Sequence, residues 1–278
     1  MSTDRAGRAA TTGVLAARAH VRAIMGTMVS IHVVADGQRR DEPQVMDAVE
    51  SAFDFLGHVD RVFSTYSVDS DICRLARGEV SVVDTDPMVT ELVELCTVAR
   101  RGTGGLFDPW WKGWFDPTGL VKGWSVEQAV GHCLRPLVES GLVEAVGVNA
   151  GGDIQVLTAP TSSWTWNVGI ADPWEPGTTI GRVVLRSGAI ATSGTIERGN
   201  HIVDPRSGSP AVSVCSATVV AQGLTDADLW ATTACVSGFD DLSWIGQAGT
   251  DSGLLIASDH RIRRWVGSEE SSTARVGV

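Results

Sequence analysis

The sequence has no excess of positive charge. Its 278 residues include 22 Lys and Arg against 33 Asp and Glu, which gives a formal net charge of -11. A chain this acidic repels phosphate backbones, so we do not expect it to bind nucleic acid. Any phosphate-bearing ligand would need a local cation, a metal ion or backbone N–H groups to offset the negative field.

The sequence also lacks long apolar runs. No window approaches the roughly 18 apolar residues of a membrane-spanning helix, so no membrane segment is expected. The small-residue run near the start of the chain is interrupted by Arg and lacks the apolar stretch of a secretory signal. We therefore expect a cytoplasmic protein with a flexible tail over residues 1–20.

Cysteine is scarce and not arranged in pairs. Five are present and none forms a Cys-x-x-Cys motif, at Cys73, Cys96, Cys133, Cys215 and Cys235. This pattern is typical of reduced, mostly buried thiols in a cytosolic protein. A repeat, a low-complexity segment and a linker are also lacking, which favours one domain over 21–267 and a second flexible tail over 268–278.

Apolar periodicity predicts both strands and helices. Strands are expected over 28–36, 142–148, 153–157, 164–171, 181–185, 189–192, 212–220, 254–258 and 262–266. Helices are expected over 43–62, 88–101, 121–140 (with an interruption at Pro136) and 225–236. The two kinds of element do not alternate as parallel βαβ units would. The predicted fold class is therefore α+β, a single domain of mixed sheets with packed helices.

Two of the predicted helices begin with residues suited to phosphate or metal chemistry. Lys122 follows a turn and opens a helix, which makes an anion site or an ordinary capped turn. Asp228 and Thr232 are four residues apart on one helical face. A carboxylate and a hydroxyl form a partial Mg²⁺ shell that carbonyl, water or phosphate oxygens can complete. The alternative is an acidic helix start and an interior threonine.

Two polar loops lie between predicted strands. In Asn149-Ala-Gly-Gly-Asp153, the glycines allow close approach to a ligand or form a hairpin turn, but a turn does not require the aspartate. In the second loop, His201, Asp204 and Arg206 follow two hydroxyl residues. That group indicates proton transfer and charge stabilisation, or a structural histidine.

Taken together and in order, these motifs resemble the ApbE family of flavin transferases. The resemblance extends over roughly residues 22–240. It is carried by Met-Gly-Thr at 25–27, Ser-Thr-Tyr at 64–66, Phe-Asp-Pro at 107–109, Lys-Gly at 122–123, Asn-Ala-Gly-Gly-Asp at 149–153, Ala-Thr-Ser-Gly at 191–194, His-Ile-Val-Asp-Pro at 201–205, and Ala-Asp at 227–228 followed by Thr232.

The resemblance implies a T-fold-related architecture and a Mg²⁺-dependent transferase. Such an enzyme moves FMN from FAD, its substrate, to a Ser or Thr hydroxyl of an acceptor protein and releases AMP. The implied metal ligands are Asp228, Thr232 and the main-chain carbonyl of Val121. The implied FAD-binding residues are Met25, Tyr66, Asp108, Lys122, Trp124, Thr192 and Ser193.

The general base has two candidates, His201 by the resemblance and Asp153 as its rival. An imidazole suits the role because it titrates near neutral pH. Two other functions stay open. Water in place of the acceptor hydroxyl would make the protein an FAD diphosphatase giving FMN and AMP, and a non-catalytic flavin-binding protein is the other alternative.

The sequence departs from the family pattern at several positions. Asn200 replaces the family's first histidine, Ala76 replaces a usual asparagine, and Ile196 replaces a usual aromatic residue. The segment before Lys122 is compact and carries three tryptophans, Trp110, Trp111 and Trp114. These departures imply a short variant with an altered rim and a different target protein.

Overall fold

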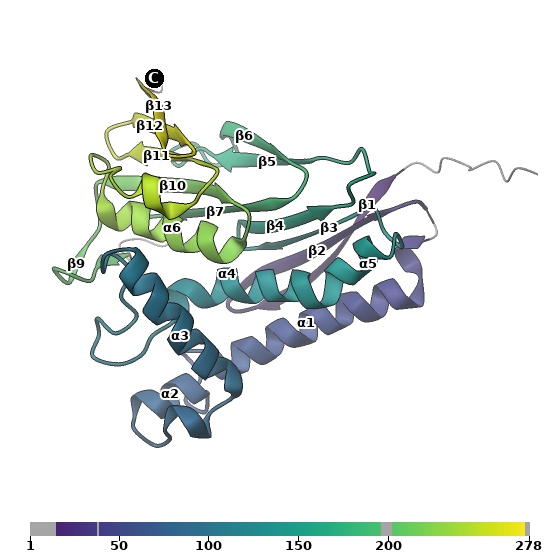
Figure 1. Ribbon diagram of the computed structural model, residues 1–278, viewed down its shortest axis with the longest axis horizontal. Coiled ribbons are helices and arrows are strands. Elements are labelled where there is room, and N and C mark those ends of the chain that lie inside the picture. The colour runs from purple at the N-terminus through teal and green to yellow at the C-terminus, as the bar shows by residue number, and fades with distance from the viewer. Residues whose placement is uncertain (1–14, 38, 196–201, 276–278) are drawn as a thin grey trace, which may run out of the picture.

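The fold is built on one long antiparallel sheet (Figure 1). The structure, a computed structural model, describes residues 15–37, 39–195 and 202–275. Within these residues, nine strands pair in the order β1-β2-β3-β4-β7-β10-β11-β12-β13. They are β1 (Ala16–Ile24), β2 (Thr27–Ala35), β3 (Ala145–Ala150), β4 (Asp153–Thr158), β7 (Gly188–Gly194), β10 (Val214–Ala221), β11 (Ser252–Ala257), β12 (Arg261–Val266) and β13 (Glu269–Arg275).

Two short hairpins and a set of helices complete the described fold. The hairpins pair β5 (Trp166–Ala171) with β6 (Thr179–Leu185), and β8 (Val203–Asp204) with β9 (Ser209–Pro210). The helices are α1 (Pro43–Phe63), α2 (Asp71–Ala76), α3 (Pro87–Gly102), α4 (Thr118–Ala129), α5 (Arg135–Glu139), α6 (Leu224–Ser237) and α7 (Ile245–Ala248). Short 3-10 turns span Arg39–Asp41 and Val82–Asp84.

The central strands are covered on both faces. Helices α1, α4 and α6 lie against one face, and the β5–β6 hairpin lies over the other (Figure 1). Strand β10 shows the consequence, because all eight of its residues are buried. Its Val219 belongs to the core under the helices, while Val220 belongs to the core under the hairpin. Alternation along one strand therefore supplies two cores.

A third hydrophobic core lies away from the sheet, among the helices. The end of α1, α2, α3 and the start of α4 surround Trp124 there. In Figure 1, α2 and α3 project from the sheet on this side of the molecule. This helical core holds α4 from one side while α6 holds it from another.

The helix predicted over 121–140 is confirmed, with an earlier start at Thr118 and a wide turn before Pro136. Between α4 and α5, residues Val130–Leu134 form a π-helical turn, and Arg135 N–H bonds to the carbonyl of Val130. Proline lacks an N–H donor and crowds the carbonyl four residues earlier, which explains why the regular ladder widens here. The other helix and strand predictions are confirmed within a few residues.

The described parts of both predicted tails include strands at the edges of the sheet. Residues 16–20 belong to β1, which pairs with β2 along its whole length, and 269–275 form β13. β1 carries His20 and two arginines on a largely exposed ribbon, as edge strands commonly do. The sequence did not predict this strand, because its residues show no alternation of buried and exposed positions. Pairing with β2 defines the strand instead.

Two expectations concern the whole described chain. None of its helices combines the length and the apolar character needed to cross a membrane. All five cysteines are free thiols, and Cys96, Cys215 and Cys235 are buried. Burial raises the pKa of Cys96 and of Cys235 to about 12, which keeps these thiols protonated and unreactive.

Candidate active site

Helices α4 and α6 approach each other closely at the candidate site. Gly123 N–H donates a hydrogen bond of 3.1 Å to Asp228 Oδ2. A β-carbon at position 123 would lie 2.6 Å from the carbonyl oxygen of Leu224 and 2.9 Å from Asp228 Cβ. Only glycine fits this contact, so Gly123 is needed for the packing of the two helices.

Lys122 connects two buried carboxylates. Its ammonium group forms an ion pair with Asp153, and Nζ lies 3.8 Å from Asp228 Oδ1. Asp153 is only 1% exposed, and its Oδ1 accepts a 3.0 Å hydrogen bond from Thr192 N–H. Buried charges are tolerated when they are paired and hydrogen-bonded. The site therefore joins α4, α6 and the ends of β4 and β7.

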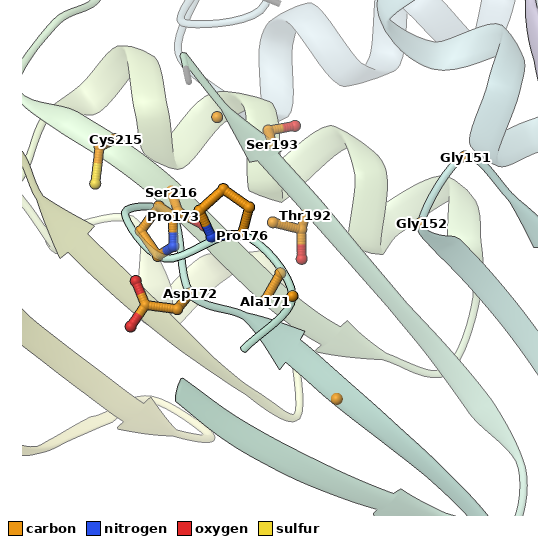
Figure 2. A pocket seen from close by; sticks show the side chains of 13 residues that line it. Gly151, Gly152, Ala171, Asp172, Pro173, Pro176, Thr192, Ser193, Cys215 and Ser216 are labelled. Atoms are coloured by element: carbon orange, nitrogen blue, oxygen red, sulfur yellow. The ribbon is translucent and has the colours of Figure 1, made fainter. Parts of the chain in front are cut away.

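Thr192 and Ser193 point to opposite faces of β7. Ser193 Oγ lies 3.0 Å from Thr232 Oγ1 on α6, and Thr192 Oγ1 lies 2.8 Å from Thr218 Oγ1 on β10. Figure 2 shows the Ser193 hydroxyl directed toward the helices and the Thr192 hydroxyl directed away from them. We call Lys122, Asp153, Ser193, Asp228 and Thr232 the polar cluster. Strand alternation directs the Ser193 hydroxyl to this cluster and the Thr192 hydroxyl to the opposite face of the sheet.

A pocket of about 440 Å³ adjoins this polar cluster. Such a volume falls in the usual range of small-molecule sites. The pocket is lined by residues from the β3–β4 turn, the β5–β6 hairpin, β7 and β10 (Figure 2): Gly151, Gly152, Gly169, Ala171, Asp172, Pro173, Pro176, Gly177, Thr192, Ser193, Gly194, Cys215 and Ser216. Ser193 lines the pocket and also contacts Thr232, and Gly151 and Gly152 line it next to Asp153 in the chain. Lys122, Asp153, Asp228 and Thr232 themselves are not among its lining residues.

The Gly151-Gly152 turn forms one wall of the pocket. Both glycines have positive φ, +61° and +99°, a backbone conformation that side chains disfavour. A β-carbon at Gly151 would also lie 2.5 Å from Thr27 Oγ1. The turn therefore places Asp153 in the polar cluster, and its two glycines, which have no side chains, line the pocket.

Met25 and Asp108 have structural partners. Met25 occupies the β1–β2 turn with φ of 54°, donates its N–H to Asp60 Oδ2 at 3.0 Å, and receives a 3.8 Å contact at sulfur from Ser125 Oγ of α4. Asp108 pairs with Arg100 at 3.0 Å and accepts the N–H of Trp110 at 2.9 Å. These contacts place Met25 beside α4 and fix the loop that precedes it.

Of the seven residues predicted to bind FAD, Thr192 and Ser193 line the pocket just described and the other five do not, including both aromatic residues. Trp124 is 3% exposed, packs against Phe55 and Phe63, and donates its indole N–H to Glu91 at 3.1 Å. Its ring fills the helical core and offers almost no surface to a ligand. Tyr66, in contrast, is 98% exposed. A short motif identifies an aromatic residue but not which way its ring faces.

The predicted base His201 lies outside the residues that the structure describes, as do Asn200 and Ile196. The two charged residues named with it, Asp204 and Arg206, are described. Asp204 forms a 2.8 Å ion pair with Arg206, and the hydrogen bond from that guanidinium lowers the pKa of the carboxyl group. Asp204 therefore stays ionised, and its contacts with the side chain and the N–H of Arg206 hold this part of the loop together.

The sequence reasoning missed the pocket wall formed by the β5–β6 hairpin. Asp172, Pro173, Pro176 and Gly177 line the pocket from its turn. Their spacing between two predicted strands was the available signal, since Asp, Pro and Gly favour turns. It also missed Glu127 of α4, whose carboxylate accepts both the N–H and the hydroxyl of Thr225 at the start of α6.

The donors around Asp228 suit a hard metal ion. In the described part of the chain, no three His, Cys, Asp or Glu side chains come together to hold a metal. A metal here would therefore need oxygen from hydroxyl and carbonyl groups, as Mg²⁺ accepts. Asp228 accepts the N–H of Gly123, and Thr232 lies one helical turn further along α6. These side chains offer carboxylate and hydroxyl oxygen, the kind of ligand that Mg²⁺ takes.

The fold resembles those of solved structures. The structure superposes on the ApbE protein of Thermotoga maritima with a TM-score of 0.73 at 20% identity, covering 94% of this chain and 97% of that one. It also superposes on the flavin transferase ApbE of Vibrio cholerae with a TM-score of 0.69 at 18% identity, covering 92% and 98%. At these identities the likeness concerns the fold alone.

The sequence gives the family. The ApbE family model matches residues 25–115 and 111–252, and this chain belongs to the ApbE family. Two FAD:protein FMN transferases are similar: one from Rhodobacter capsulatus, 39% identical over 136 residues, and one from Klebsiella pneumoniae, 28% identical over 123 residues. The matches cover 45% and 41% of this chain, but only 25% and 35% of those proteins.

Proposed function

We propose that this protein transfers FMN from FAD to a Ser or Thr hydroxyl of an acceptor protein in a Mg²⁺-dependent reaction that releases AMP. The observation that carries the proposal is the contact between Gly123 N–H and Asp228, which joins the Lys-Gly and Asp-x-x-x-Thr segments beside the pocket. The two transferases similar in sequence support the reaction class.

In this proposal the 440 Å³ pocket holds part of FAD, with the pyrophosphate near Asp228 and Lys122. Asp228, Thr232 and the Val121 carbonyl would hold Mg²⁺, which supplies charge neutralisation at the phosphoryl oxygens. The Lys122 ammonium adds a second positive charge to this otherwise acidic chain. Ser193 orients the Thr232 hydroxyl through their 3.0 Å contact.

The reaction is a displacement at phosphorus. The acceptor hydroxyl oxygen forms a bond to the phosphorus on the FMN side, the phosphoanhydride P–O bond breaks, and AMP leaves. The hydroxyl proton goes to a base. Because Asp153 is buried and already engaged by Lys122 and Thr192 N–H, we assign it to positioning Lys122 and assign the base to His201.

The test is incubation of the purified chain with FAD and MgCl₂, with and without lysate from cells that lack this protein. We expect a protein in the lysate to gain the mass of FMN on a Ser or Thr, and we expect EDTA to prevent the gain. Asp228→Asn should abolish it. Asp226→Asn is the matched control, because Asp226 lies on the same helix two residues earlier.

The alternatives give different products. Release of FMN and AMP without any modified protein would show an FAD diphosphatase. Binding of FAD without either product would show a non-catalytic flavin-binding protein. Undiminished transfer by Asp228→Asn at low Mg²⁺ concentration would contradict the metal assignment.

A further inference from the structure

The turn of the β5–β6 hairpin forms the outer wall of the pocket. We define the lid segment as residues 172–178. Asp172, Pro173 and Pro176 of this segment line the pocket together with Thr192 and Ser216 of the sheet (Figure 2). The shape of the pocket therefore depends on how firmly the lid segment is held against the sheet.

The lid segment is held in shape by hydrogen bonds among its own residues. Asp172 Oδ1 accepts the N–H groups of Trp174 and Glu175 at 2.9 and 3.3 Å. Asp172 N–H bonds to the carbonyl of Thr178, and Thr178 N–H bonds to the carbonyl of Glu175. These contacts fix the shape of the segment but not its position over the sheet.

A ring stack joins the lid segment to the sheet. The rings of Trp174 and His260 lie 3.9 Å apart between centroids with an interplanar angle of 22°. His260 belongs to the turn between β11 and β12, strands of the nine-stranded sheet. The contact therefore ties the tip of one hairpin to the turn of another, and we call it the Trp174–His260 clasp.

The backbone at His260 adopts an uncommon conformation. His260 has φ of 68°, in the left-handed region where glycine and asparagine are favoured. Its N–H closes the turn to the carbonyl of Ala257 at 3.0 Å, a bond that any such residue would make. The turn needs no imidazole, whereas the stack on Trp174 does.

We propose that Trp174 and His260 are positioning residues for the flavin nucleotide: their stack holds the lid segment over the pocket and thereby sets the affinity for FAD. The inference rests on the proposed function, since FAD is its ligand. The clasp touches none of the residues assigned to the chemistry, so its loss weakens binding and leaves turnover at saturating FAD unchanged. His260 also lies beyond the residues that the family model matches, which end at 252.

Two single variants and their combination test the clasp. Trp174→Ala removes one ring, and His260→Asn removes the other while suiting the left-handed backbone. An aromatic pair contributes enough for each variant to weaken FAD binding about twofold to tenfold. Both substitutions remove the same contact. The double variant should therefore bind FAD about as tightly as the single variant with the lower affinity. Trp174→Phe should restore most of the affinity.

The binding measurement is quenching of FAD fluorescence in MgCl₂, and hydrogen exchange supplies a second measurement without flavin. Amides of residues 174–178 should exchange faster in Trp174→Ala and His260→Asn than in the wild type. Trp164→Ala is the control, because Trp164 stacks edge-on against Trp166 at the other end of the hairpin. It should leave both measurements unchanged.

Several outcomes would overturn the inference. Wild-type affinity for FAD in both single variants overturns the clasp but leaves the proposed function standing. Faster exchange with unchanged FAD affinity also overturns it, because the stack would then be merely structural. A wild-type protein that does not bind FAD overturns the proposed function and the clasp together.

Discussion

Gly123 donates its N–H to the carboxylate of Asp228 at 3.1 Å, although the two residues are 105 positions apart in the chain. The contact closes the interface of α4 and α6 and sets Lys122 beside the same carboxylate. Packing of two helices and assembly of the polar cluster are therefore one event. A change that separates the helices also disperses the cluster.

Gly123→Ala should destabilise the fold by about 1–3 kcal/mol, since the added methyl group is forced against the Leu224 carbonyl 2.6 Å away. Urea unfolding measures the loss. Gly131→Ala is the control, because no atom lies within 4 Å of a β-carbon there, and it should be neutral or slightly stabilising. Equal stability of the two variants would contradict the close contact.

Lys122→Met should cost about 3 kcal/mol or more of unfolding free energy, because the buried Asp153 carboxylate loses the cation that neutralises it. The second substitution Asp153→Asn should recover part of that loss. Lys112→Met, which breaks the 2.8 Å pair with Asp116 at an exposed lysine, should cost less than about 1 kcal/mol. Chemical denaturation of the wild type, the two single variants and the double variant measures these losses. Equal losses of unfolding free energy in Lys122→Met and Lys112→Met would contradict the prediction.

Thr232→Val should raise the Mg²⁺ concentration for half-maximal FMN transfer by about tenfold or more, since a metal-site oxygen is lost. Thr232→Ser keeps the hydroxyl and should behave like the wild type. Thr233→Val serves as a neighbouring control, because that hydroxyl bonds only within its helix, to the Leu229 carbonyl at 2.8 Å. A Mg²⁺ dependence unaffected by Thr232→Val would remove Thr232 from the proposed metal shell.

Acidification should destabilise the protein partly through His32. Burial, followed by the nearby charge of His20, lowers the pKa of His32 in the folded state. Below a pH of about 6.5, His32 is therefore protonated in the unfolded chain but still neutral in the folded chain. The free energy of unfolding consequently falls as the pH falls. His32→Gln should show a shallower decline between pH 7 and pH 5 in urea unfolding. Identical slopes would mean that His32 does not contribute.

The sequence predicted most elements of the fold because their periodicity is strong. Helix α1 and strand β2 bury regularly spaced apolar residues, and such spacing is visible without coordinates. Strand β1 was missed because its residues are mostly exposed and only its pairing with β2 defines it. The π-turn before Pro136 was anticipated as an interruption, although its geometry was not.

The sequence alone determined which chemical groups this protein has: an acidic chain, a lysine after a turn, and an aspartate and a threonine one helical turn apart. Tertiary structure decided which of them meet. It paired Lys122 with Asp153 and Asp228, sent Trp124 into the helical core, and placed the lid segment over the pocket. Local patterns specify residue types and periodicity, whereas contacts between segments a hundred residues apart depend on how whole helices and sheets pack.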